Sequence, residues 1–137
     1  MTSWHAGASA SSTVFAEDTS RVTTETNNTW VDLGGPSVAI TVPPSGLIEV
    51  RVRADITLGH PDSAGVLGVV DSGGLLAPAK GLFQGGSTFG GRVEGFWVSI
   101  ELPPGPTVIS MRYQGFHTSA PTSTVAFANR KLWVRPT

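Results

Sequence analysis

Apolar and polar residues alternate along several segments of the chain, as they do in β-strands with one buried face. The clearest case is residues 47–57, where the even positions from Ile48 to Ile56 are apolar. The odd positions from Glu49 to Asp55 carry charges of both signs. This pattern predicts a strand with its even positions in a core. Its odd positions then face water or a partner, where opposite charges on neighbouring strands can pair.

Similar alternation predicts further strands, which end at Gly- and Pro-rich turns. The segments are residues 21–26, 29–33, 37–42, 96–102, 107–114, 124–129 and 131–135. Two of the turns resemble each other, because Pro43-Pro44 and Pro103-Pro104 each join one predicted strand to the next. Repeated corners suit a sandwich of two sheets. We therefore predict an all-β fold, an antiparallel β-sandwich of jelly-roll type with about eight strands; an immunoglobulin-like sandwich is the alternative.

Two regions lack a sustained pattern. Residues 1–20 are small and polar with isolated apolar residues such as Trp4 and Phe15, and we predict an extended N-terminal arm that lies on a neighbouring copy or on a shell beneath it. Residues 21–137 then form a single sandwich domain. Within it, residues 59–95 hold 11 of the 17 glycines, so that the boundaries of their elements stay open.

Composition narrows the class of protein. The 137 residues suffice for one domain, and the formal net charge of −1 provides no basic excess to neutralise a nucleic acid. The first residues lack the basic start and the apolar run of a signal peptide, and no stretch is apolar enough to cross a membrane. With no cysteine, disulfides and thiolate chemistry are excluded. We expect a soluble all-β protein without a nucleic-acid or membrane partner.

Few motifs suggest chemistry. Asp71-Ser72-Gly73 resembles a protease nucleophile segment, but its surroundings lack the expected histidine arrangement. The three histidines, His5, His60 and His117, are scattered without the spacing of metal ligands. The Gly-rich residues 85–91 lack the lysine of a phosphate-binding loop. We predict no enzyme activity, no cofactor and no metal site.

Aromatic residues provide the candidate binding surface. Trp30, Trp97 and Trp133 each fall on the side of their strand opposite the aliphatic residues, and Trp4 and Phe15 lie in the predicted arm. Exposed aromatic rings on a sheet suit a subunit interface or a platform for stacked sugars. We predict that these five residues form an interface between copies of the chain, and a carbohydrate-binding platform is the alternative.

Two stretches carry a resemblance to a known family. The first is Val22–Ile56, with a Thr-rich strand, Asn-Thr-Trp-Val-Asp-Leu, Gly-Gly-Pro and Val-x-Ile-x-Val-Pro-Pro-Ser-Gly-Leu-Ile-Glu-Val. The second is the ending Asn129–Pro136, Asn-Arg-Lys-Leu-Trp-Val-Arg-Pro. Both resemble small jelly-roll domains in virion proteins of tailed bacteriophages, especially those of actinobacteria. Together they cover about a third of the chain.

The resemblance implies a fold and a role. Such domains are similar to the trimeric tumour-necrosis-factor and C1q heads, and they occur as head decorations, head fibres and parts of tail tips. The implied function is a capsid decoration protein in the virion, which binds the major capsid protein or another virion protein as a homo-oligomer, with a trimer expected. The alternative is a carbohydrate-binding or host-adhesion module of a phage tail or fibre, with a surface glycan as partner. The resemblance implies no catalytic residues.

Overall fold

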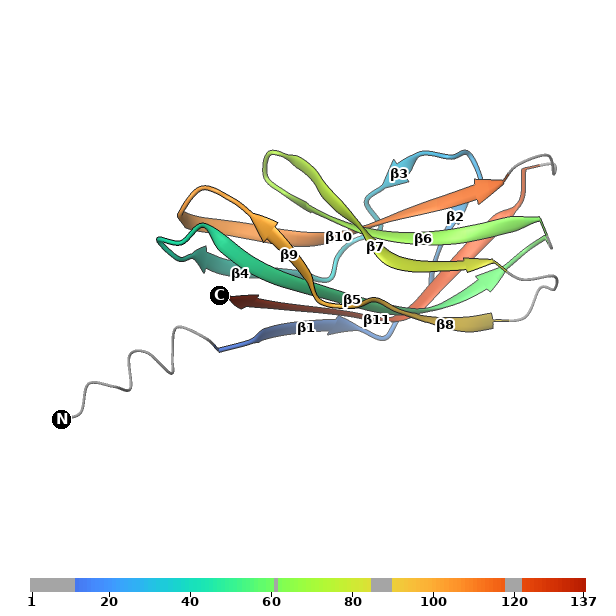
Figure 1. Cartoon of the computed structure of the whole chain (residues 1–137). Coiled ribbons are helices and arrows are strands. Elements are labelled where there is room, and N and C mark those ends of the chain that lie inside the picture. Colours follow the sequence, from blue (N-terminus) through green and yellow to red (C-terminus); the bar gives the residue numbers. More distant parts are fainter. Residues whose placement is uncertain (1–11, 61, 85–89, 118–121) are drawn as a thin grey trace.

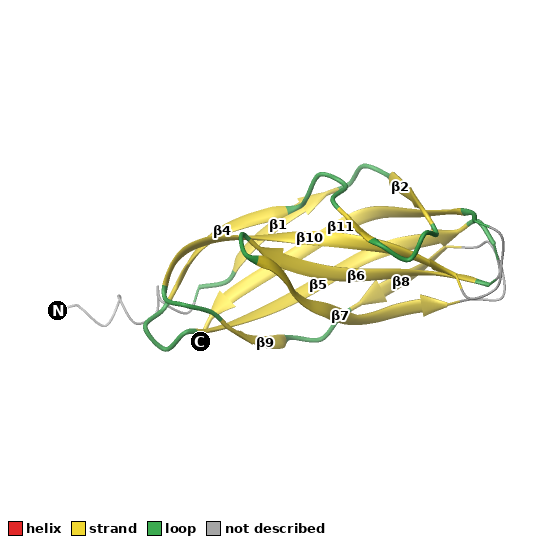
Figure 2. Ribbon diagram, turned by 90° about the horizontal axis from the view of Figure 1, so that it is seen from above, coloured by secondary structure: helices red, strands yellow, loops and turns green. Residues whose placement is uncertain are grey.

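The computed structural model describes residues 12–60, 62–84, 90–117 and 122–137, and in these the chain forms eleven strands and no helix. The strands make two antiparallel sheets that pack face to face (Figure 1). This confirms the predicted all-β antiparallel sandwich. In Figure 2 the strands of both sheets run roughly along the long axis of the molecule.

The first sheet has six strands in the order β1-β11-β5-β8, with β2 paired to the first part of β11 and β9 to the first part of β5. Its strands are β1 (Val14–Asp18), β2 (Val22–Glu25), β5 (Leu47–Leu58), β8 (Gly90–Glu94), β9 (Val98–Glu101) and β11 (Thr124–Pro136). We call it the six-stranded sheet. The long strands β5 and β11 lie side by side at its centre and carry most of its pairing.

The second sheet has five strands in the order β3-β10-β6-β7, with β4 paired to the first part of β10. Its strands are β3 (Trp30–Val31), β4 (Ser37–Val42), β6 (Ser63–Asp71), β7 (Gly74–Gln84) and β10 (Gly105–His117). We call it the five-stranded sheet. Strands β3 and β4 follow one another along the same side of β10, and β6 pairs with its other side.

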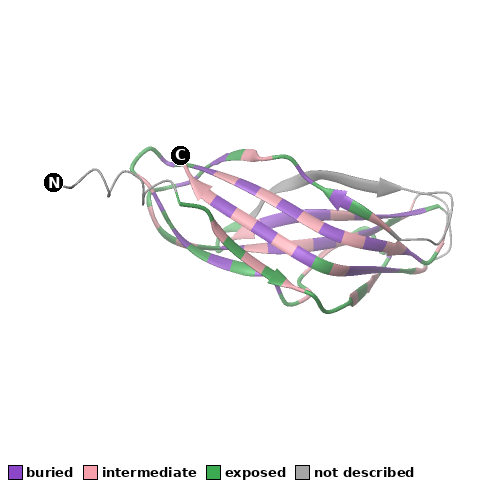
Figure 3. Cartoon of the chain, turned by 90° about the horizontal axis from the view of Figure 1, so that it is seen from below, coloured by how far each residue is buried: buried purple, intermediate pink, exposed green. Residues whose placement is uncertain are grey.

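The core lies between the sheets and follows the predicted alternation. Every even position of β5 from Ile48 to Leu58 is buried, and so are Ile109, Met111 and Tyr113 on β10. Buried and partly exposed positions alternate visibly along the strands in Figure 3. The sheets approach closely at Gly65 of β6, because a Cβ atom there would lie 2.7 Å from the Cγ2 atom of Ile56. A glycine at this position leaves room for the side chains of Ile56, Val125 and Phe127, which project from the facing sheet.

The structure adds strands that the pattern left open. The Gly-rich middle forms β6, β7 and β8, and Val14–Asp18 of the predicted arm forms β1 at the edge of the six-stranded sheet. Residues 1–11 of that arm lie outside the described residues. One prediction was placed too early in the chain, because the strand expected from residue 96 begins at Val98 and the side chain of Phe96 is 74% exposed.

Residues 124–129 and 131–135, predicted as two strands, belong to the single strand β11. A bulge separates Ala128 from Lys131 in the pairing with β5, and Asn129 within it has a φ of 49°. An extra residue in a bulge shifts the side-chain alternation of its strand. Arg130 consequently points into the sandwich and is 1% exposed.

Candidate interaction surfaces

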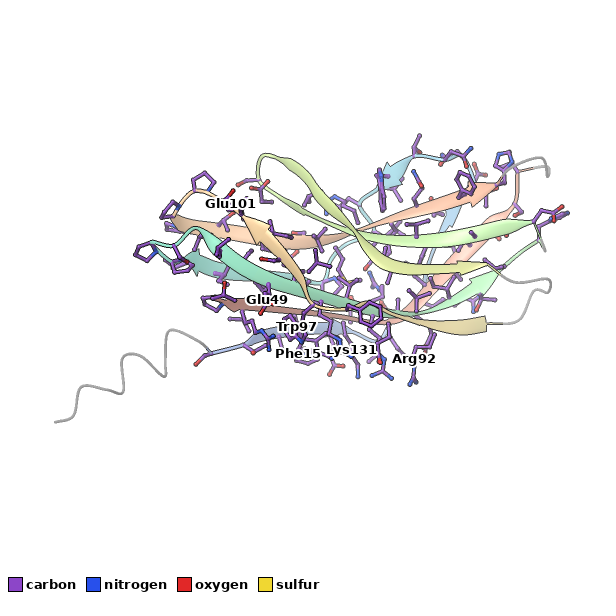
Figure 4. The ribbon with its side chains drawn as sticks, in the orientation of Figure 1. Phe15, Glu49, Arg92, Trp97, Glu101 and Lys131 are labelled. Carbon is purple, nitrogen blue, oxygen red and sulfur yellow. The ribbon has the colours of Figure 1, made fainter. Side chains whose placement is uncertain are left out.

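The outward side of the six-stranded sheet is rich in charge, and we call it the charged face. It carries five cationic and six anionic side chains, which are Arg51, Arg53, Arg92, Lys131 and Arg135 with Glu17, Glu25, Glu49, Asp55, Glu94 and Glu101. Figure 4 shows Phe15, Glu49, Arg92, Trp97 and Lys131 on this side of the molecule. The eleven charges sum to −1, so that the face has little net charge with which to attract anions or cations over a long range.

Most of these charges pair with a neighbouring strand, as the alternation along β5 predicted. Arg51 and Arg53 each lie 3.4 Å from an oxygen of Glu94 on β8, and Arg92 lies 3.5 Å from Asp55. Lys131 of β11 lies 4.0 Å from Glu17 of β1. Exposed pairs of this kind contribute about 0 to 1 kcal/mol each. The charged face is therefore suited to contact with water, and its ion pairs add little to stability.

Three of the five predicted interface residues lie on the charged face. The rings of Phe15 on β1 and Trp133 on β11 are 5.3 Å apart, and the guanidinium of Arg51 lies 5.2 Å from the centre of the Trp133 ring. The Arg135 guanidinium lies 3.9 Å above the ring of Trp97. A sugar that stacks on this side of Trp97 has to displace the guanidinium. The contact between Arg135 and Trp97 therefore disfavours the binding of a sugar to this ring.

The other two predicted interface residues are not part of this group. Trp30 lies on the five-stranded sheet, where it pairs with Gln114 on the outward side of β10, and Trp4 lies outside the described residues. Alternation assigns each ring to one side of its own strand. It does not assign the strand to a sheet, because that depends on pairing between distant segments.

The outward side of the five-stranded sheet differs sharply in charge, and we call it the uncharged face. Its described positions on β3, β4, β6 and β10 are Trp30, Ser37, Ala39, Thr41, Ala64, Val66, Gly68, Val70, Pro106, Val108, Ser110, Arg112, Gln114 and Phe116. Arg112 is the one charged residue among them, and it lies 3.7 Å from Asp32. Val108 and Phe116 are 48% and 36% exposed. A hollow of about 500 Å³ lies beside Ala39 and Val108.

Sequence reasoning missed this face. On β10, Ile109, Met111 and Tyr113 form the more strongly apolar side, so that Val108 and Phe116 fall at positions that alternation assigns to solvent. The available signal was the absence of charge. Apart from Arg112, no Asp, Glu, Lys or Arg occurs in residues 105–117, and none occurs in residues 37–42.

A buried polar cluster closes one side of the sandwich. Arg130 donates hydrogen bonds to the carbonyl oxygen of Gly35 at 2.9 Å and to the Tyr113 hydroxyl at 3.2 Å, and its Nη2 atom lies 3.1 Å from Asp18. The Tyr113 hydroxyl itself donates to Gly35 at 2.6 Å. The cluster ties β1 and the segment before β4 to β10 and β11.

Two groups of this cluster have shifted pKa values. Hydrogen bonds from the hydroxyl and the backbone N–H of Ser20 lower the pKa of Asp18, and the charge of Arg130 adds to this effect. Burial raises the pKa of Tyr113 to about 12, although its hydrogen bond with Arg130 acts in the opposite direction. At neutral pH Asp18 is therefore ionised and Tyr113 is neutral. Neither group changes its charge near neutral pH, so that the cluster stabilises the fold.

The residues considered for chemistry have local structural roles. The backbone N–H of Asp62 donates to Nδ1 of His60 at 3.1 Å, and the N–H of Gly73 donates to Asp71 in the turn between β6 and β7. The part of the chain that the structure describes contains no group of three or more His, Cys, Asp or Glu that could hold a metal ion. The same part contains no helix long and apolar enough to span a membrane. His5 and residues 85–89 lie outside it.

Comparison with known proteins supports the fold. No protein-family model and no curated protein matches the sequence. Among solved structures, the VP2 subviral particle of infectious bursal disease virus matches 90% of this chain and 33% of its own, with a TM-score of 0.61 and 8% identity. T=1 particles derived from the same virus match 91% of this chain and 31% of theirs, with a TM-score of 0.58 and 11% identity.

These likenesses have a limited extent. The chain spans about a third of the length of the VP2 chains that it matches. A CBM36-1 domain of a xylanase from the hindgut metagenome of Trinervitermes trinervoides matches 89% of this chain and 96% of its own, with a TM-score of 0.42 and 14% identity. Its score is too low to support an argument. The chain therefore shares its β-sandwich with viral capsid proteins, at an identity that shows the fold alone.

Proposed function

We propose that this chain is a virion structural protein, namely a decoration protein that binds the capsid surface of a tailed bacteriophage as a homo-oligomer, with three copies as the expected number. The observation that carries the proposal is the uncharged face. Among its described positions this broad sheet surface has one charged residue. Monomeric proteins rarely expose large surfaces that are so poor in charge, and such surfaces mark interaction sites.

The size of the uncharged face suits an interface. The described side chains cover three strand positions across, or about 14 Å, along the thirteen residues of β10, or about 40 Å. The product is roughly 600 Å² per copy, and two such surfaces together approach the ~1,200 Å² at which stable interfaces begin. The face is thus large enough to hold copies together or to bind them to a particle.

Two further observations support a virion as the location. The chain shares its sandwich with viral capsid proteins. The stretches Val22–Ile56 and Asn129–Pro136 resemble jelly-roll virion proteins of tailed phages, for which the major capsid protein is the expected partner. Arg135 above Trp97 weighs against the alternative, a carbohydrate-binding or host-adhesion module.

The native mass of the full chain tests the proposal. We expect light scattering at micromolar concentration to give the mass of three chains. Lysine at the exposed Val108 places a charge on the uncharged face, so that Val108→Lys lowers the mass and weakens sedimentation with phage particles. Ser99→Lys, at an exposed position of β9 on the other sheet, is the matched control and retains both properties. A full-length protein that is monomeric and does not sediment with particles would contradict the proposal.

A further inference from the structure

Strand β4 has a free edge. It pairs with β10 on one side, and no other strand among the described residues pairs with it. Natural edge strands are protected from pairing by charges, prolines or bulges. Strand β4 reads Ser-Val-Ala-Ile-Thr-Val, without any of these, and its register with β10 is regular. By contrast, the edge strand β1 carries Glu17 and Asp18, and β8 carries Arg92 and Glu94. The edge of β4 is thus open to an added strand.

An apolar groove lies beside this edge. It has a volume of about 450 Å³ and is lined by Ser12, Val14, Ala39, Ile40, Thr41, Pro43, Pro44 and Pro136. These residues come from the start of β1, from β4 with the corner that follows it, and from the end of β11. Figure 1 shows that β4 and β11 end, and β1 begins, at the same end of the sandwich. The groove provides an apolar seat for side chains of a segment paired to β4.

Residues 1–11, which precede the described part of the chain, have the length and composition to pair with β4 beside this groove. Ser12, the residue that follows this segment, itself lines the groove. Residues 1–11 can extend over about 36 Å, which exceeds the roughly 20 Å length of the six residues of β4. They contain no acidic residue, lysine or arginine, and their many Ser, Ala and Gly residues permit close backbone approach. Trp4 supplies one large apolar group.

We propose that residues 1–11 of one copy add as a strand to the free edge of β4 in a neighbouring copy, with Trp4 in the groove. A neighbouring copy is favoured over the same one by direction. Strand β1 begins where β4 ends, so that a straight continuation of β1 leaves the sandwich at that end. To reach β4 of its own copy, the segment has to reverse its direction over Pro43-Pro44. This inference rests on the oligomer of the proposed function and names the contact that joins its copies.

Cross-linking tests the inference cleanly, because the chain has no cysteine of its own. One variant carries Thr41→Cys on β4, and a second, of different mass through a tag, carries a cysteine at Ala6, Ala8 or Ala10 in turn. The two are mixed, exchanged at low concentration and oxidised mildly. We expect a disulfide-linked product of one chain of each kind. The matched control pairs the same segment variants with Ser99→Cys on β9 and gives no such product.

A deletion provides a second measurement. Removal of residues 1–11 is expected to reduce the native mass to that of one chain with an unchanged circular dichroism spectrum. A labelled peptide of residues 1–12 then binds the shortened protein, and Thr41→Lys weakens this binding. An oligomer that survives the deletion, or a mixture of the two cysteine variants that gives no disulfide-linked product of one chain of each kind, would overturn the inference and leave the proposed oligomer standing. A monomeric full-length chain would instead remove the oligomer on which both depend.

Discussion

Replacement of Arg130 with methionine removes the guanidinium that joins β11 to β1, β10 and the segment before β4. Methionine keeps an apolar stem of similar length but donates no hydrogen bond. The change removes hydrogen bonds to the Gly35 carbonyl at 2.9 Å and to the hydroxyls of Tyr113 and Ser20, both at 3.2 Å, and it removes the ion pair with Asp18. It therefore tests whether this buried cluster stabilises the sandwich.

The magnitude follows from which partners find a replacement. Hydrogen bonds to a charged group contribute about 1.5 to 3 kcal/mol each. The Gly35 carbonyl still accepts from Tyr113, and the partly exposed Asp18 carboxylate gains water, so that only about half of the four interactions are lost without compensation. We expect the free energy of unfolding to fall by about 3 kcal/mol. For 137 residues, with about 2.1 cal/mol/K of unfolding entropy per residue, this lowers Tm by about 10 °C.

Urea denaturation followed by tryptophan fluorescence measures the effect. The matched control is Arg92→Met, which removes an arginine with a 58% exposed side chain from its pair with Asp55 on the charged face. That change is expected to cost less than about 1 kcal/mol. If Arg130→Met costs no more than Arg92→Met, with equal m-values, the cluster does not stabilise the fold and the reasoning fails.

Further predictions concern packing and pH. Gly65→Ala places a methyl group 2.7 Å from Ile56, and we expect overpacking to cost about 1 to 3 kcal/mol in urea denaturation; a neutral result would show that the sheets separate easily. The pKa of Tyr113 is raised from 10.0 to about 12, so that its stabilisation is complete below pH 10 and is lost as the pH rises toward 12. This difference in pKa corresponds to about 3 kcal/mol, and Tyr113→Phe should flatten this part of the pH–stability curve. The pKa of Asp18 is lowered from 3.8, so that its contribution is present above pH 3.8 and is lost as the pH falls further; Asp18→Asn should remove this acid loss.

Much of the fold could be predicted from alternation, because a strand with one buried face shows its period in the sequence. The even positions of β5 and the odd positions of β10 from Ile109 to Tyr113 were identified in this way, and the charges of β5 pair across strands as predicted. The pattern failed where glycine replaces side chains. In β6, Gly65 and Gly68 are buried but have no side chain, so that the sequence of this strand lacks the alternation of apolar and polar residues.

The candidate site was harder to predict, because it depends on pairing between distant segments. The apolar neighbour Val31 shows on which side of its strand Trp30 lies. That Trp30 is separated from Trp97 and Trp133 follows only from the sheet to which its strand belongs. Arg130 shows the same limit. As an arginine between two strand segments it suggests solvent, and only the bulge after Ala128 turns it inward.

The distribution of charge connects the fold to the proposed role. Eleven of the nineteen Asp, Glu, Lys and Arg residues of the chain lie on the charged face, and nine of them form ion pairs with one another. This arrangement keeps one side of the sandwich in water without attracting a charged partner. It leaves the uncharged face and the edge of β4 as the surfaces from which water can be removed at low electrostatic cost, because burying an unpaired charge is far more unfavourable than burying serine, threonine or valine. Both surfaces include Ala39 and Thr41. A lysine at either of these exposed positions would place a charge where the face and the edge meet, so that we expect it to weaken an assembly while it changes the stability of an isolated chain little.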